Sequence, residues 1–380
     1  MIRLKSDKII VGESLFNGYV YVCDGKIVEV SNEEKPVDAT YDYTGKYVSA
    51  GFIDIHTHGA GGYAFMNNTV QDVINGCDYH LDHGTTSIVP TISAGAFETM
   101  KNAVINILDA QGKSKANILG AHLEGPYLSP NQAGAQCPLF ITAPIKKDYE
   151  SLVEEYGDSI TRWTYAPEND VNGEFCKFLT EHNIIASAGH TDAKYDDMKV
   201  AIDNGCNLIT HLYSSTSTVT RKQGFRSLGV IESAFLRDEL YVEIIADGKH
   251  LPPDLIKMII KIKGTDSVAL ITDSLEIAGT DIKEGVMSGT EFIVEEGVCR
   301  LKDRSAFAGS IATADKLIRT LVFDCDFAIP TAVKMLTEVP AKILKINKGA
   351  IAKNYDADII VFDEDINIGD VWVAGKKVKN

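Results

Sequence analysis

The sequence predicts a closed (β/α)8 barrel that carries a small β-sandwich built from both ends of the chain. Three observations lead to this fold class. Short runs rich in β-branched residues alternate with longer amphipathic stretches, and eight such runs follow one another along the chain. Residues able to bind a metal or move a proton gather at the carboxyl ends of these runs, where a barrel of this kind places its functional groups.

Eight runs are expected to form the barrel strands. They cover residues 51–59, 85–93, 116–126, 160–168, 183–191, 206–214, 240–248 and 267–275. Stretches at 69–84, 96–113, 174–183 and 195–205 have the apolar period of helices, and several end near a Gly or Asn suited to a helix C-terminus. Parallel strands that are each followed by a helix close into the architecture of a TIM barrel.

The two ends of the chain have a different pattern. Residues 1–49 and 347–380 alternate apolar and polar side chains around turns such as Asp24-Gly25 and Ala374-Gly375, as hairpins do. Neither segment alone could make a stable sheet. We therefore predict that they combine into one β-sandwich domain, which would bring the termini near each other, and that residues 50–346 form the barrel domain.

Composition excludes several classes of partner. The chain has 380 residues, 45% of them hydrophobic, which is enough for one large core and a small satellite. Its formal charge of -16 repels nucleic acid and anionic lipid, so we expect neither as a partner. The seven cysteines form no C-x-x-C pair, which favours reduced thiols over a disulfide framework or a zinc ribbon.

The amino end lacks the apolar core of a signal peptide. No run in the chain approaches the roughly eighteen apolar residues of a membrane span. We therefore expect a cytoplasmic protein.

Five residues of metal-ligand type lie at the ends of predicted strands: His56, His58, Glu124, His190 and His211. Residues i and i+2 of a strand face the same side, so the first two should converge on the barrel axis. Imidazole nitrogen and carboxylate oxygen suit a borderline divalent ion such as Zn or Fe. The alternative, polar residues satisfied at strand tips, would not place so many of them at strand ends. Three further histidines in helical or turn segments are interpreted as surface or packing residues: His80, His83 and His182.

Asp273 follows the eighth predicted strand, in the segment LITDS. A carboxylate there could touch both a metal and its bound water, whose pKa such an ion lowers to ~7. Asp273 could then take a proton from the water and give it to a leaving nitrogen. The alternative is that its side chain caps the following turn.

Seven segments, in this order and across almost the whole chain, resemble the N-acetylglucosamine-6-phosphate deacetylases of the amidohydrolase superfamily: GFIDIHTHG, HLEGPYLSP, GHT, THLY, EIIADGKH, LITDS and FAGS. The resemblance implies a (β/α)8 barrel with a β-sandwich, a homodimer, and hydrolysis of N-acetyl-D-glucosamine 6-phosphate to glucosamine 6-phosphate and acetate. It further implies that Glu124, His190 and His211 hold the principal metal and that Asp273 transfers the proton. Some members bind one ion and lack the H-x-H pair, so retention of that pair makes a second ion plausible.

The resemblance also implies a set of substrate-binding residues. His250 would hydrogen-bond the sugar, and Arg221 would reach the phosphate held by the neighbouring subunit, where an Arg fork matches phosphate geometry. The full set is Ala135, Gln136, Ser214, Ser215, Arg221, Asp247, His250, Phe307, Ala308 and Gly309. Simple alternatives are a solvated loop charge for Arg221, a capping residue for His250 and a tight loop for Phe307–Ser310.

Two positions depart from the pattern of these deacetylases. Gln136 stands where they usually have a histidine that helps polarise the acetyl carbonyl, and glutamine cannot carry positive charge. Ser214 stands where an asparagine usually contacts the phosphate end. Both changes concern the substrate rather than the metal ligands.

Two other functions remain open on the sequence alone. One is a related amidohydrolase acting on a different N-acylated amino sugar or small amide. Many of those carry a carboxylated lysine at the end of the fourth strand, whereas here the fourth run ends in YAPEND, without lysine. The other is an inert structural barrel, which the retention of every ligand-type residue disfavours.

Overall fold

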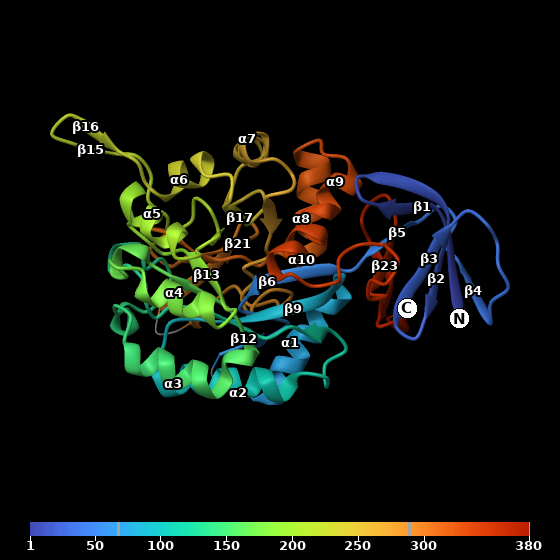
Figure 1. The fold of residues 1–380 in the computed structure, drawn as a ribbon, viewed down its shortest axis with the longest axis horizontal. Coiled ribbons are helices and arrows are strands. Elements are labelled where there is room, and N and C mark those ends of the chain that lie inside the picture. Colours follow the sequence, from blue (N-terminus) through green and yellow to red (C-terminus); the bar gives the residue numbers. More distant parts are fainter. Residues whose placement is uncertain (67–68, 288–289, 380) are drawn as a thin grey trace.

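The computed structural model describes residues 1–66, 69–287 and 290–379, and Figure 1 shows its two parts, a barrel and a sheet made from the chain ends. The barrel strands are all parallel and match the eight predicted runs, with the third split into two short pieces. They are β6 (Phe52–Thr57), β9 (Thr85–Ile92), β10 (Asn117–Ile118), β11 (Ala121–Glu124), β12 (Ile160–Tyr165), β13 (Ile185–Ala188), β14 (Leu208–Ile209), β17 (Tyr241–Ile244) and β18 (Val268–Leu270). The predicted fold class is therefore confirmed.

The barrel closes just beyond the ends of its last and first strands. The backbone N–H of His58 donates to the carbonyl of Ser274 at 2.8 Å, and that of Asp273 donates to the carbonyl of His56 at 2.9 Å. These hydrogen bonds join the segment after β18 to the end of β6 and its following residue. Closure thus involves three residues that the sequence predicts to be functional, His56, His58 and Asp273.

Helices surround the strands on the outside (Figure 1). They are α1 (Val70–Asp82), α2 (Phe97–Ala110), α3 (Lys146–Tyr156), α4 (Glu174–Glu181), α5 (Tyr195–Asp203), α6 (Val230–Leu236), α7 (Pro253–Lys263), α8 (Ala314–Arg319), α9 (Ile329–Lys334) and α10 (Glu338–Leu344). The start of α1 shows how sequence sets a boundary. Thr69 accepts a hydrogen bond from the Asp72 N–H through its hydroxyl, and the Asp72 carboxylate accepts from the Thr69 N–H, a reciprocal capping box.

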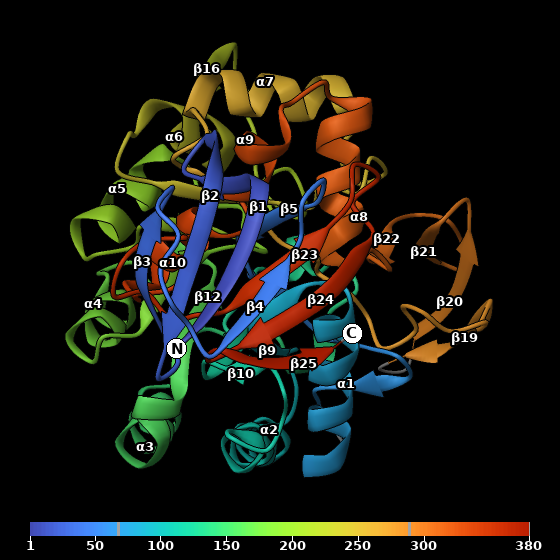
Figure 2. The ribbon, with the colours of Figure 1, turned by 90° about the vertical axis from the view of Figure 1, so that its right-hand side faces the viewer.

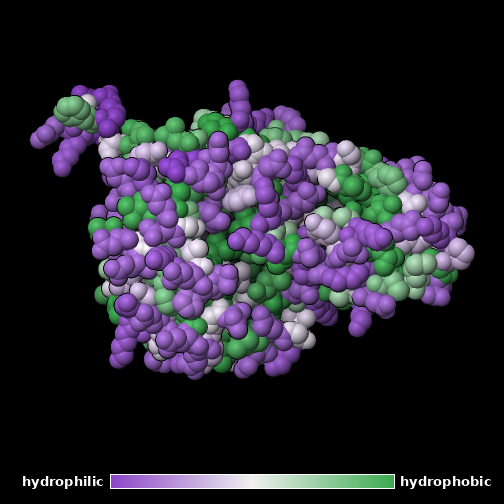
Figure 3. Space-filling model, viewed as in Figure 1, coloured by the Kyte–Doolittle hydropathy of each residue, from purple (hydrophilic) through white to green (hydrophobic). Residues whose placement is uncertain are grey.

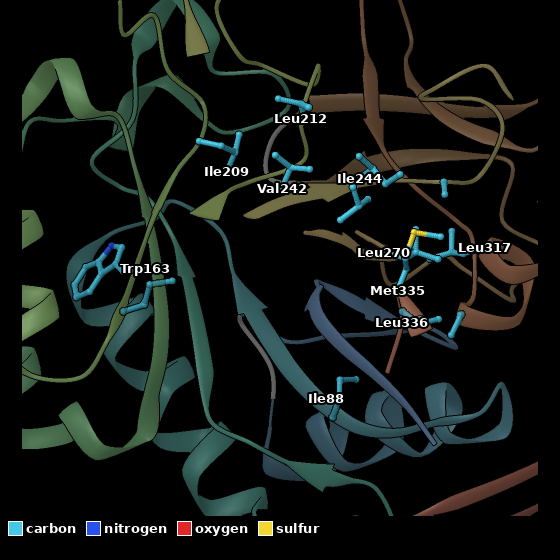
Figure 4. Packing of buried hydrophobic residues seen from close by; sticks show 14 of the residues in the cluster. Ile88, Trp163, Ile209, Leu212, Val242, Ile244, Leu270, Leu317, Met335 and Leu336 are labelled. Carbon is cyan, nitrogen blue, oxygen red and sulfur yellow. The ribbon is translucent and has the colours of Figure 1, made fainter. Parts of the chain in front are cut away.

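Most of the apolar core lies between the barrel strands and these helices. Figure 4 shows part of it, where Leu270 of β18 lies beside Leu317 of α8 and Met335 after α9, and Ile209 of β14 lies near Val242 of β17. Leu317, Leu270 and Val242 are fully buried. A second apolar layer fills the lower barrel and is covered by Val339, Ala341 and Ile343 of α10. The polar side chains described below therefore have an apolar layer beneath them.

The two chain ends form one mixed eight-stranded sheet with its own apolar core. Its strands are β1 (Ile2–Val11), β2 (Ser14–Cys23), β3 (Lys26–Ser31), β4 (Ala39–Asp42), β5 (Tyr47–Ala50), β23 (Ile359–Phe362), β24 (Ile368–Val373) and β25 (Lys376–Lys379). The ends meet where β23 pairs antiparallel with β5, Ile359 opposite Ala50. Figures 1 and 2 show that both termini belong to this sheet. The domain boundaries at residues 49/50 and 346/347 stay predictions.

The chain passes from this sheet into the barrel at Gly51. A Cβ at this position would lie 2.1 Å from the Thr86 hydroxyl oxygen, far inside contact distance. Only glycine allows β5 and β6 to follow one another so closely beside β9. The connection between the two parts of the molecule is therefore short and tightly packed.

Three smaller sheets extend the barrel. They are β7 (Gly59–Ala60) with β8 (Tyr63–Ala64), β15 (Thr220–Lys222) with β16 (Phe225–Ser227), and the four strands β19 (Glu284–Met287), β20 (Thr290–Glu295), β21 (Val298–Leu301) and β22 (Phe307–Gly309). The hairpin β15–β16 projects from the body in Figures 1 and 3, and Phe225 on it is 81% exposed. The sequence analysis did not predict the four-stranded sheet. After its last strand, Ser310 forms a parallel β-bridge with Ser274, which lies just beyond β18.

Two compositional expectations can also be compared with the structure. All seven cysteines are free thiols, five of them buried, as expected for a chain without a disulfide framework. Among the described residues, no helix is both long enough and apolar enough to cross a membrane.

The pairing of β23 with β5 predicts a stability effect. Ile359 is 1% exposed within the core of the chain-end sheet, so Ile359→Ala should lower the free energy of unfolding by about 2–5 kcal/mol, measured by urea denaturation. The exposed Lys376→Ala in the same sheet is the control and should change it by less than about 0.5 kcal/mol. Equal effects of the two substitutions would contradict the packing described here.

Candidate active site

Six predicted site residues meet at the carboxyl end of the barrel, around the carboxylate of Glu124. Glu124 Oε1 lies 3.2 Å from His190 Nε2, 3.0 Å from His211 Nε2 and 3.4 Å from His56 Nε2. Glu124 Oε2 lies 3.2 Å from His58 Nε2. Asp273 Oδ1 completes the group at 3.5 Å from His56 Nε2 and 3.3 Å from His58 Nε2. The structure thus brings together residues from β6, β11 and the segments that follow β13, β14 and β18.

Each of the four imidazoles has its other ring nitrogen, Nδ1, engaged outside this centre. The Nδ1 of His58 lies 3.1 Å from Ser93 Oγ, that of His190 lies 2.8 Å from the Gln132 carbonyl, and that of His211 lies 3.1 Å from the Ser214 carbonyl. For His56 the partner is a carboxylate, Glu243 Oε2, at 3.3 Å. An Nδ1–H that donates outward leaves the lone pair of Nε2 directed inward, which is how proteins orient histidine ligands.

The donor set fits a divalent cation. Two groups, His56 with His58 and Asp273, and His56 with Glu124 and His211, each have their ligand atoms within 4.8 Å of one another. Ligand atoms placed tetrahedrally at about 2.1 Å from an ion lie about 3.4 Å apart, close to the separations seen here. His56 Nε2 is buried and makes no hydrogen bond to any described residue. Two carboxylates facing four imidazoles also offer the charge that one divalent ion would neutralise.

The electrostatics of the protein alone agree with this interpretation. Burial lowers the pKa of His56 and of His58, but the carboxylates of Glu124 and Asp273 outweigh it and raise them to about 10 and about 9. Burial likewise acts to raise the pKa of Asp273, but the imidazoles of His56 and His58 bring it down to about 2. The centre therefore attracts positive charge, which protons or a metal ion can supply.

Three of these residues have an unusual backbone. His190, His211 and Asp273 adopt φ angles of 46°, 29° and 46°, in the left-handed region that residues other than glycine rarely adopt. Such conformations persist where surrounding contacts hold them, and they gather at functional sites. At three strand ends the chain accepts backbone strain and points a side chain at the centre.

The centre opens into a cavity of about 580 Å³. Of the predicted substrate-binding residues, eight line it: Ala135, Gln136, Ser214, Ser215, His250, Phe307, Ala308 and Gly309. Asp247 and Arg221 do not. Among the described residues, no Lys or Arg lines this cavity.

Gln136 contacts the centre directly. Its side-chain carbonyl accepts a hydrogen bond from the Ala94 N–H at 2.9 Å, and its amide nitrogen donates to Glu124 Oε2 at 2.7 Å. The first bond fixes the orientation of the amide, so its two N–H groups both lie on the side of the cavity. One of them is engaged by Glu124, and the other can serve a ligand.

Asp247 acts through His250. Its Oδ2 lies 2.7 Å from His250 Nδ1, and its Oδ1 accepts the backbone N–H groups of Lys249 and His250 at 2.8 Å each. The His250 ring packs against Phe307, with centroids 4.7 Å apart. Asp247 therefore orients an imidazole whose Nε2 is available to the cavity.

Arg221 lies on the projecting hairpin, on the exposed strand β15. It does not reach the cavity of its own chain. The sequence analysis assigned it to the site of a second subunit, and that assignment stays a prediction. The histidines set aside as packing or surface residues lie outside the cavity lining: His80 is buried against the Thr57 hydroxyl and Gly59 carbonyl, His83 contacts Asp315, and His182 contacts the Phe178 carbonyl.

The sequence analysis missed the polar layer beneath the centre. Arg162 on β12 and Glu243 on β17 are fully buried and form an ion pair inside the barrel. His122 on β11 bonds the hydroxyls of Thr91 and Thr164. A signal was present, because Arg162 and Glu243 are single charges inside otherwise uncharged strand runs, ITRWTY and LYVEII, and a charge in a buried strand requires a partner.

A model of the amidohydrolase family matches residues 47–378. An N-acetylglucosamine-6-phosphate deacetylase of Lysinibacillus sphaericus is 30% identical over 362 residues, 94% of this chain and 92% of the relative. An N-acetylgalactosamine-6-phosphate deacetylase of Shewanella sp. is 29% identical, covering 88% of this chain and 84% of the relative. The crystal structure of N-acetylglucosamine-6-phosphate deacetylase from Pasteurella multocida has a TM-score of 0.93 at 28% identity and covers 100% of both chains.

The raised imidazole pKa values predict proton release on metal binding. In the metal-free protein the pKa values of His56 and His58 are about 10 and about 9. A pH of 7.5 is below both values, so both imidazoles carry protons that a bound ion would displace. Calorimetric titration with Zn²⁺ in two buffers of different ionisation enthalpy should therefore give different heats. As the pH rises through 9–10, the protons are already lost and the difference should shrink. Identical heats in both buffers at pH 7.5 would contradict the prediction.

Proposed function

The chain belongs to the amidohydrolase family, and we propose that it is the member that hydrolyses N-acetyl-D-glucosamine 6-phosphate to D-glucosamine 6-phosphate and acetate. The observation that carries the proposal is the meeting of Glu124, four histidines and Asp273 at the carboxyl end of the barrel, where all of them except His56 line one cavity. The relatives with this activity match the chain over nearly its whole length.

Glu124, His190 and His211 would hold the principal ion, and His56 and His58 would hold a second one beside Asp273. We propose Zn or Fe, with one or two ions per subunit, because the donors are imidazole nitrogen and carboxylate oxygen. Such an ion would supply Lewis-acid polarisation of the acetyl carbonyl and would lower the pKa of water, so that hydroxide could act as the nucleophile near neutral pH. The remaining chemistry falls to the side chains of this chain.

Asp273 would move the proton. Its carboxylate is ionised at neutral pH, since its pKa is about 2, and it faces the same point as the histidine Nε2 atoms. It would accept a proton as the water oxygen bonds to the acetyl carbon. It would then deliver that proton to the sugar nitrogen as the C–N bond breaks, so that the products leave as an amine and acetate.

Gln136 would orient the acetyl group. Its free N–H can donate to the carbonyl oxygen, because its other N–H is held by Glu124 and its own oxygen by Ala94. His250, oriented by Asp247, would hydrogen-bond the sugar, and Phe307 beside it would pack against the ring. Ala135, Ser214, Ser215, Ala308 and Gly309 would line the rest of the substrate site.

The phosphate would be bound between two subunits. Among the described residues, the lining of the cavity supplies no Lys or Arg, although the substrate is an anion. Arg221 stands on a hairpin that projects from the body and carries the exposed Phe225. In a homodimer this hairpin would bring Arg221 to the partner's cavity. The homodimer, like a cytoplasmic location, stays a prediction from the sequence.

A second candidate substrate is another N-acylated amino sugar. The Shewanella relative is named for the galactosamine epimer, and it is nearly as similar to this chain as the glucosamine enzymes are. Gln136 and Ser214, both in the cavity lining, depart from the sequence pattern of the glucosamine enzymes. The acetyl chemistry would be the same, and the difference would lie in which sugar the cavity accepts.

A substrate panel tests the assignment. N-Acetylglucosamine, N-acetylgalactosamine and their 6-phosphates are compared by acetate release. We expect N-acetylglucosamine 6-phosphate to have the highest kcat/KM. Arg221→Ala should remove most of the preference for the phosphate, because a charge-assisted bond is lost. In the unmodified protein, equal kcat/KM for substrates with and without the phosphate would refute the role given to Arg221. A higher kcat/KM for N-acetylgalactosamine 6-phosphate would establish the second candidate.

Asp273→Asn tests the proton transfer. The amide keeps the shape of the side chain but cannot accept the proton, so kcat should fall by at least about 100-fold, the lower end of what general acid–base catalysis contributes. Metal content, measured by elemental analysis, should stay nearly unchanged because Glu124, His190 and His211 are intact. Substantial residual turnover in a metal-loaded variant would show that another group carries the proton.

A further inference from the structure

We propose that Glu243, neutralised by Arg162, is a positioning residue that fixes two of the metal ligands, His56 and His211, from beneath. The inference deepens the proposed function and rests on it, since it assumes that a divalent ion binds at the centre. Neither Arg162 nor Glu243 lines the cavity, so neither touches the substrate. Their role would be carried entirely through the histidines.

One carboxylate oxygen of Glu243 contacts both ligands. Oε2 lies 3.3 Å from Nδ1 of His56 and 3.4 Å from the backbone N–H of His211. The first contact orients a ring that comes from β6. The second supports the backbone of His211, whose φ of 29° is strained. A single group on β17 therefore connects ligands that are 155 residues apart in the sequence.

The other carboxylate oxygen, Oε1, is bound by Nη1 of Arg162. The guanidinium spans the barrel: Nη1 also donates to the Ile55 carbonyl at 3.2 Å, and Nη2 donates to the hydroxyls of Ser187 and Thr210 at 3.1 Å each. These partners belong to β6, β13 and the end of β14. Arg162 is thus held by the same strands that carry His56, His190 and His211, and it fixes Glu243 relative to all of them.

The contact of Glu243 with His56 differs from those of the other three histidines. Their Nδ1 atoms meet neutral oxygens, those of Ser93, Gln132 and Ser214, whereas that of His56 meets a carboxylate. A carboxylate partner fixes the tautomer and makes the opposite nitrogen a stronger donor to a metal. His56 also belongs to both of the residue groups that could hold an ion, so its orientation affects either position.

Stability alone does not account for a charged pair at this place. Replacing a buried ion pair by apolar residues of similar volume often leaves stability unchanged or improves it, whereas removing one partner is costly. An apolar cluster that includes Ile53, Leu208 and Ile271 already packs inside the barrel. The presence of a charged pair at this place is explained if the Glu243 carboxylate is needed to orient the ring of His56.

The test separates metal binding from folding by comparing two variants. Glu243→Gln removes the charge and leaves Arg162 unpaired, so it should lower both the unfolding midpoint and the Zn²⁺ affinity. The double variant Glu243→Leu with Arg162→Met replaces the pair by apolar groups, so it should recover the unfolding midpoint. Its Zn²⁺ affinity should nevertheless stay about 10–100-fold below that of the unmodified protein, the usual loss when such an outer partner is removed. Affinity is measured by competition with a chromophoric chelator.

Asp315→Asn is the matched control. Asp315 is 5% exposed, and it too pairs with an arginine, Arg319, and a histidine, His83, but away from the cavity lining. It should lower stability and leave Zn²⁺ affinity unchanged. Zn²⁺ affinity equal to that of the unmodified protein in the double variant would overturn the inference while the proposed function stood. Failure of the unmodified protein to bind either Zn²⁺ or Fe²⁺ would instead overturn the proposed function, and the inference with it.

Discussion

The architecture depends on how the barrel closes. The segment after β18 meets the end of β6 through backbone hydrogen bonds between Asp273 and His56 and between His58 and Ser274. Three of these four residues, His56, His58 and Asp273, have side chains that face the centre. The hydrogen bond between the Asp273 N–H and the His56 carbonyl holds the two residues side by side. The Asp273 carboxylate therefore lies close to the His56 ring, with Oδ1 at 3.5 Å from Nε2. Barrel closure and the assembly of the polar centre are therefore one event, and a barrel that failed to close would have no site.

Charge is distributed unevenly, and this distribution explains how an acidic protein can hold its centre together. The chain carries a formal charge of -16, yet the carboxylates at the centre and in the layer beneath it face imidazoles or an arginine. Glu243 faces Arg162, and the carboxylates of Glu124 and Asp273 face four imidazoles. Buried charge is tolerated when it is paired. The excess of acidic residues is left to the solvent-exposed surface, much of which is polar in Figure 3.

The barrel was predictable because its short strands, which are buried on both faces, alternate in the sequence with longer amphipathic helices, which bury one face. The centre was predictable for a related reason: parallel strands end on one rim, so ligand-type residues at successive ends had to meet. Glu243 and Arg162 were missed because their role depends on contacts across the barrel between β12, β17 and β6, which no local pattern contains. The sheet β19–β22 was missed because its strands are short and pack mainly on one another and on Leu275 and Ile277.

The chain-end sheet has a consequence for synthesis on the ribosome. Strands β1 to β5 emerge first, but β23, which covers the free edge of β5, begins only at Ile359, near the end of the chain. While the barrel is being made, β5 therefore keeps an unpaired edge, of the kind that invites pairing with other chains. The sheet that precedes the barrel in the sequence is thus completed only after the barrel, and incomplete chains of this protein should be most prone to aggregate while β23 is still missing.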